Sequence, residues 1–88
     1  MKLNENFILR QVAGTWVVLP VGEATAKFNG MLSLNETGAM LWNQLLEGKN
    51  KDDLVNALTS EYNVTAEVAQ GDVEDFLTKL VKVGCLET

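Results

Sequence analysis

The sequence contains no histidine and only one cysteine, Cys85. A single thiol cannot assemble the usual His/Cys metal site, and without histidine no serine, threonine or cysteine has the common base that activates a nucleophile. Glycine-rich phosphate motifs and paired acid/base carboxylates are not recognisable either. We therefore expect a protein that is not an enzyme and binds no cofactor or metal. Cys85 is expected to be a buried packing residue, and a reactive thiol is the alternative.

Positive charge is also scarce. Seven Lys and Arg residues stand against twelve Asp and Glu residues, which gives a formal net charge of -5. This balance argues against nonspecific binding to nucleic acid or to anionic lipid, since both need positive charge. No apolar run is long enough to span a membrane, and Met1–Glu5 is too polar and acidic for a signal peptide. With one cysteine and no export signal, the expected location is cytoplasmic.

The 88 residues are 47% hydrophobic and 22% charged, as in an ordinary globular protein. This length predicts one domain over residues 1–88. Phe7–Val12 and Thr15–Pro20 are rich in β-forming residues and predict an antiparallel hairpin, because Gly14 between them tolerates a positive φ. Residues 21–30 are irregular, with a short helical turn expected near 23–26, and residues 31–34 predict a third, edge strand.

The segment Leu32–Trp42 predicts a strand that runs directly into a helix. Leu32 and Leu34 alternate with other residues, and Asn35 can then cap the helix with its side-chain oxygen. A competing capping box would begin at Ser33. Because such a junction leaves a free sheet edge beside the helices, we expect the function to lie at this edge.

Three helices are predicted, over about 36–46, 52–62 and 66–83. Gly48 and Gly84 are suited to end the first and third, and Asn63 could close the second in a left-handed conformation. Three strands followed by three helices predict an α+β fold, a winged-helix-like arrangement with a three-stranded antiparallel sheet. DNA binding is disfavoured, because the third helix carries Glu67, Asp72, Glu74 and Asp75 against only two lysines.

With these elements in place, the sequence resembles the PqqD-like family of small peptide chaperones, also called RiPP recognition elements. The resemblance lies in the junction Leu34-Asn35-Glu36-Thr37-Gly38-Ala39 with Trp42, in the run from Asp72 to Leu80, and in Gly84-Cys85-Leu86. It implies binding of the leader segment of a precursor peptide by strand addition to the third strand. It also implies delivery to a modifying enzyme, in particular a radical SAM enzyme of the SPASM type.

Carried onto this chain, the resemblance implies a peptide-binding site between the third strand and the third helix. The strand side would be Gly30, Met31, Leu32, Ser33 and Leu34, and the helix side Asp72, Val73, Asp75, Phe76, Leu77, Lys79 and Leu80. Core packing is the alternative for the four apolar helix residues, and a solvated face is the alternative for the two aspartates.

One segment departs from the family pattern. Residues 21–30 form a longer link than the short Pro-x-Gly link of members dedicated to pyrroloquinoline quinone, so the product is left unassigned. A competing function is a generic protein–protein adaptor that uses the same strand edge. Because unpaired edges invite pairing, the edge could also form a homodimer.

Overall fold

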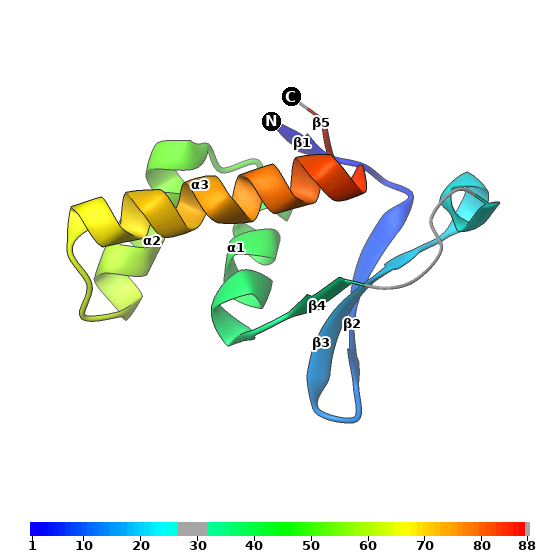
Figure 1. Ribbon diagram of the computed structural model, residues 1–88, viewed down its shortest axis with the longest axis horizontal. Helices are drawn as coiled ribbons and strands as arrows, with labels where there is room; N and C mark the ends of the chain where they lie inside the picture. Colours follow the sequence, from blue (N-terminus) through cyan, green and yellow to red (C-terminus); the bar gives the residue numbers. More distant parts are fainter. Residues whose placement is uncertain (27–31, 88) are drawn as a thin grey trace.

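The computed structural model describes residues 1–26 and 32–87 and has an α+β fold (Figure 1). A three-stranded antiparallel sheet, in the order β2-β3-β4, precedes three helices, which confirms the predicted fold class. The elements are β1 (Lys2–Leu3), β2 (Phe7–Val12), β3 (Thr15–Pro20), the 3-10 helix η1 (Gly22–Ala26), β4 (Leu32–Leu34), α1 (Glu36–Leu46), α2 (Lys51–Glu61), α3 (Ala66–Val83) and β5 (Leu86–Glu87).

The predicted hairpin is formed by β2 and β3, with Val12 opposite Thr15. Ala13 and Gly14 make the two-residue turn, and both have positive φ, 50° and 81°. Positive φ at both positions is the mark of a type I′ turn, whose twist matches that of the flanking strands. The third strand, β4, pairs antiparallel with the other side of β3.

The helices begin where the sequence places capping residues. Asn35 is the N-cap of α1, so the competing frame at Ser33 is not used. Asn50 and Asp53 form a reciprocal capping box, with bonds of 2.9 and 3.0 Å, which starts α2 at Lys51, one residue earlier than predicted. α3 spans the predicted residues and ends at Gly84, whose φ of 94° is left-handed.

The predicted left-handed closure of α2 at Asn63 is wrong. The chain leaves the helix through Tyr62 in extended backbone, with φ −127° and ψ 151°, and Ala13 is the one non-glycine residue with positive φ in the described ranges. The Tyr62 N–H still makes a helical hydrogen bond, to the Leu58 carbonyl, but its extended φ and ψ then turn the chain out of the helix. No left-handed residue is needed to end α2.

The hydrophobic core lies where the three helices meet the sheet. Trp42 of α1, Leu54 of α2 and Leu80 of α3 are almost completely buried there. Cys85 joins the same core with no exposed surface, as expected of a packing residue, and burial raises its pKa from 9.0 to about 11. No helix in the described ranges is long and apolar enough to cross a membrane.

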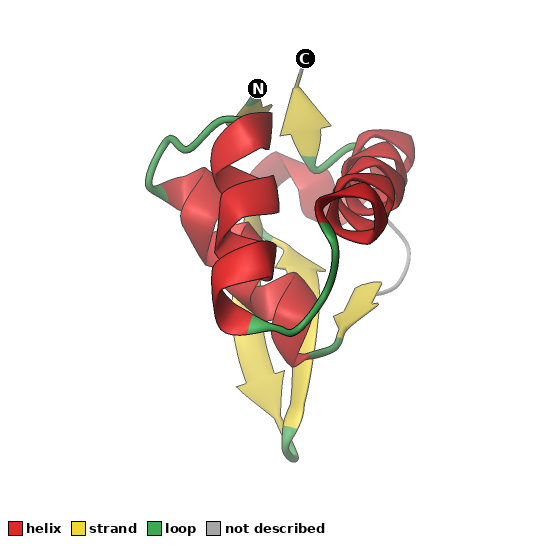
Figure 2. Cartoon of the chain, turned by 90° about the vertical axis from the view of Figure 1, so that its left-hand side faces the viewer, coloured by secondary structure: helices red, strands yellow, loops and turns green. Residues whose placement is uncertain are grey.

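A second, two-stranded sheet was not predicted. β1 and β5 pair antiparallel, with Leu3 opposite Leu86, and the Asn4 N–H donates to the Cys85 carbonyl at 2.7 Å. The two ends of the chain therefore lie next to each other (Figure 2). Two-residue strands are too short to show a periodic pattern, which explains why no sequence pattern indicated them.

Candidate functional site

β4 is an edge strand, and its register shows which of its backbone groups face outward. Residues that flank a type I′ turn form a hydrogen-bonded pair, and such pairs alternate with non-hydrogen-bonded ones along an antiparallel ladder. Counting from Val12 opposite Thr15, Val17 points its N–H and C=O toward β2, whereas Trp16 and Val18 point theirs toward β4. Pro20 falls at a non-hydrogen-bonded position opposite β2, as its missing N–H requires.

The same count extends to β4. Trp16 is opposite Leu34 and Val18 is opposite Leu32, so these are the hydrogen-bonded pairs of β3 and β4. Ser33 stands between them, opposite Val17, in a non-hydrogen-bonded pair. Its backbone N–H and C=O therefore point away from β3, toward the free edge of the sheet.

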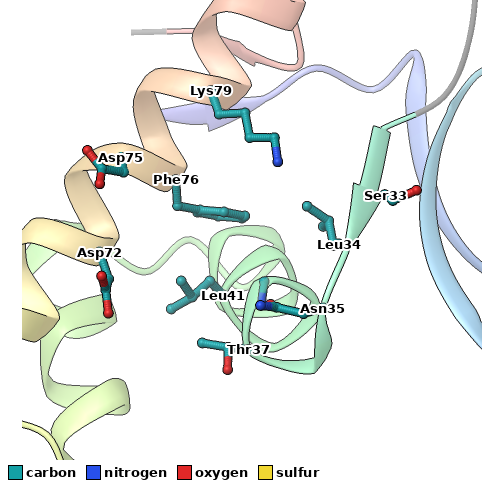
Figure 3. Close-up of a pocket in the computed structure, with 10 residues that line it drawn as sticks. Ser33, Leu34, Asn35, Thr37, Leu41, Asp72, Asp75, Phe76 and Lys79 are labelled. Carbon is teal, nitrogen blue, oxygen red and sulfur yellow. The ribbon is translucent and has the colours of Figure 1, made fainter.

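Beside this edge lies an open groove of about 500 Å³ between β4, α3 and the first turns of α1 (Figure 3). Leu34, Leu41 and Phe76 form its apolar floor, and each is largely buried. Polar side chains form the rim. The complete lining is Ser33, Leu34, Asn35, Thr37, Gly38, Leu41, Asp72, Asp75, Phe76 and Lys79.

The groove brings together six of the twelve residues that the resemblance implied: Ser33, Leu34, Asp72, Asp75, Phe76 and Lys79. Val73 and Leu80 lie instead in the core, with no exposed surface, as the alternative for apolar helix residues foresaw. Leu32 is half-buried against the core. Leu77 lines a separate apolar hollow that also contains Val81. Gly30 and Met31 lie outside the described residues.

Four lining residues were missed as site residues: Asn35, Thr37, Gly38 and Leu41. The sequence carried a signal for one of them, a glycine in the first turn of a helix, where glycine weakens the helix. A Cβ at Gly38 would lie 3.2 Å from the Leu34 Cβ and 3.3 Å from the Asn35 Oδ1. Glycine therefore lets the first turn of α1 approach the end of β4 closely.

The rim carries three charged side chains, all from α3. Asp72, Asp75 and Lys79 are exposed, and none of them forms an ion pair with another described residue. The ion pair that α3 does form is outside the groove and joins Lys51 Nζ to Glu74 Oε1 at 2.7 Å. In the described ranges no group of acidic, cysteine or histidine side chains could hold a metal ion. The site thus offers backbone hydrogen bonds, an apolar floor and a charged rim.

A family model described as Coenzyme PQQ synthesis protein D (PqqD) matches residues 15–86. The chain belongs to this family. The match begins at β3 and includes β4, the three helices and the start of β5, so it contains the whole groove. No curated protein sequence matches this PqqD-family chain.

Two solved structures share the fold along nearly their whole length. One is described as TbiB1 in complex with the TbiA(beta) leader peptide; it is 26% identical, with a TM-score of 0.83, over 99% of this chain and 95% of that one. The other is described as lasso peptide synthetase B1 complexed with the leader peptide; it is 28% identical, with a TM-score of 0.81, over 99% and 96%. Neither description mentions a radical SAM enzyme.

Proposed function

We propose that this PqqD-family domain is a RiPP recognition element, which binds the leader segment of a ribosomally made precursor peptide. The leader adds to the sheet as a strand at the free edge of β4. The observation that carries this proposal is the outward-facing backbone of Ser33 beside the groove. The two similar structures, both described as complexes with leader peptides, support it.

The two parts of the site have different roles in this proposal. Backbone hydrogen bonds to Ser33 supply affinity that is independent of leader sequence, as in other cases of strand addition. Side chains alternate along the added strand, so every second one enters the groove over Leu34, Leu41 and Phe76. These side chains supply specificity, because the floor accepts apolar groups.

The bound leader is then delivered to a modifying enzyme, which we propose to be a radical SAM enzyme of the SPASM type. The domain itself performs no chemistry in this scheme. A generic adaptor role remains a second candidate, because the same free edge of β4 can accept a strand from any protein, including a second copy of this chain.

An NMR titration of the isotope-labelled domain with the leader half of the neighbouring precursor peptide tests the proposal. We expect the largest amide shifts at Ser33 and along the groove face of α3, around Asp75 and Lys79. A spectrum unchanged at high micromolar peptide, with shifts on addition of the modifying enzyme alone, would contradict leader binding and favour the adaptor role.

A further inference from the structure

The charged residues on the groove rim are ordered along α3. Asp72 and Asp75 lie toward the N-terminal half of the groove-lining segment, and Lys79 lies at its C-terminal end. The lining residues outside α3, which come from β4 and the start of α1, are all uncharged. A peptide in the groove therefore meets negative charge at one end and positive charge at the other.

The Lys79 side chain extends toward the groove and away from Asp75, which precedes it by one turn of α3. Asp75 and Lys79 stand four residues apart in the order that favours an ion pair on a helix surface. The described residues nevertheless contain no ion pair between them. Figure 3 shows the Lys79 side chain reaching toward Leu34 beside the Phe76 ring, with the Asp75 carboxylate turned the other way. The ammonium group is thus left for a ligand in the groove.

The direction of the added strand follows from the arrangement of the elements. β4 runs toward α1 while α3 runs the opposite way, as both Figure 1 and Figure 3 show. We take the leader to add antiparallel to β4, the orientation of both other strand pairs in this sheet, and it then runs in the same direction as α3. Its N-terminal part lies near Asp72, and its C-terminal part lies near Lys79.

The spacing of the charges can be converted into leader residues. A helix rises ~1.5 Å per residue, so Asp75 and Lys79 are separated along the axis by about 6 Å, and Asp72 and Lys79 by about 10 Å. A strand advances ~3.4 Å per residue, and its groove-facing residues are two apart. The separation of about 6 Å matches two strand positions, ~7 Å, so the charged leader residues should be two positions apart if the first faces Asp75. The separation of about 10 Å lies midway between two and four positions, ~7 and ~14 Å, so a basic residue that faces Asp72 should stand two or four positions before the acidic one.

We infer that the leader carries a basic residue followed, two or four positions later, by an acidic residue, with both side chains on the groove side of the strand. This inference rests on the proposed function and adds the chemical class of leader that the groove selects. Lys79 contacts the acidic residue, Asp72 or Asp75 contacts the basic one, and an apolar side chain contacts Phe76 between or beside them. Lys79 is the specificity-determining residue of the acidic position.

A displayed library of random peptides provides the test, because it requires no knowledge of the natural leader. We expect the peptides that bind the domain to be enriched in the order basic, then acidic, at these spacings. Exchanging the two charged residues within a selected peptide should weaken its binding roughly five-fold, an effect of the size typical of exposed ion pairs. Raising the salt concentration should reduce this difference.

Charge reversal in the protein supplies the matched control. Lys79→Glu should abolish the preference for an acidic residue and favour a basic one there, whereas Lys82→Glu makes the same charge change on the same helix but outside the groove and should leave the preference intact. Asp72→Lys and Glu67→Lys form a second such pair. Selected peptides with no charge order, or with the acidic residue before the basic one, would overturn this inference but not the proposed function. A library with no binders at all would contradict the proposed function.

Discussion

The Oδ1 atom of Asn35 accepts a hydrogen bond of 2.8 Å from the backbone N–H of Gly38. This bond joins the last residue before α1 to the first turn of that helix, and both residues line the groove. One side chain therefore both starts the helix and holds the end of β4 in place. The helix cap is therefore part of the lining of the candidate groove.

Asn35→Ala should lower the free energy of unfolding by about 1 kcal/mol, because the capping bond is lost. It should also weaken leader binding, since Asn35 lines the groove. Asn50→Ala is the control: it removes the cap of α2, a comparable loss of stability, but Asn50 lies outside the groove. Urea unfolding and peptide titration of both variants would decide. Equal losses of affinity in the two variants would show that the weaker binding follows from lower stability and not from the position of Asn35 in the groove.

Gly38→Ala and Gly71→Ala should have opposite consequences, although both place alanine in a helix. At Gly71 a Cβ meets nothing within 4 Å, so the substitution should stabilise the protein by about 0.5–1 kcal/mol. At Gly38 the new Cβ would press on Leu34 and Asn35. We expect that variant to lose this gain, to unfold at lower urea concentration than Gly71→Ala, and to bind leader more weakly. A Gly38→Ala protein as stable as Gly71→Ala would refute the close-approach argument.

Ser33→Pro should weaken leader binding about ten-fold, because it removes the one outward N–H donor on β4 identified by the register, worth ~1–1.5 kcal/mol. Proline is tolerated at sheet edges, so the fold should persist. Ser33→Ala keeps the N–H and removes only the hydroxyl, and should lose much less affinity than Ser33→Pro. Circular dichroism checks the fold of both. Unchanged affinity in folded Ser33→Pro would mean that the leader uses another register.

The buried thiol of Cys85 predicts a loss of stability at high pH. Its folded pKa of about 11 lies above the reference value of 9.0, because burial disfavours the thiolate. Below pH 9.0 the thiol is protonated in both states and has no effect; above it the unfolded state loses its proton first, so stability falls until about pH 11. The decrease is at most about 2–3 kcal/mol, at ~1.36 kcal/mol per pKa unit.

Cys85→Ala isolates this contribution, because the two proteins differ only in the side chain at this position. The difference in unfolding free energy between wild type and variant should shrink as the pH rises from 9 to 11. A difference that stays constant with pH would show that Cys85 titrates alike in the folded and unfolded states. At pH 7 an alkylating reagent should react with the wild type only as fast as the protein opens.

The sequence predicted those parts of the fold that depend on neighbouring residues. The turn at Ala13-Gly14, the cap at Asn35 and the end of α3 at Gly84 each rest on the local chemistry of a few atoms, and all three are present. The pairing of β1 with β5 depends on residues at opposite ends of the chain, and no local pattern specifies it.

The candidate site was only partly predictable for a related reason. Val73, Phe76 and Leu80 belong to one apolar stripe, and periodicity cannot tell which of them faces the core and which the groove. The rotation of α3 against α2 and α1 decides this, and it buries Val73 and Leu80 while leaving an edge of Phe76 in the groove. Leu41 and Thr37 were missed because the resemblance placed the site between the third strand and the third helix, and no residue of the first helix was assigned to its lining.

The pairing of β1 with β5 also has a consequence for how the chain can be rearranged. Because the first and last strands are hydrogen-bonded neighbours, the backbone nearly closes on itself, and a short linker could join its ends. New ends could then be opened at the exposed turn Ala13-Gly14, giving a circular permutant in which β3, β4 and the helices follow without interruption. In such a chain β3, with the groove elements behind it, would come first, and its sheet partner β2 would be added last.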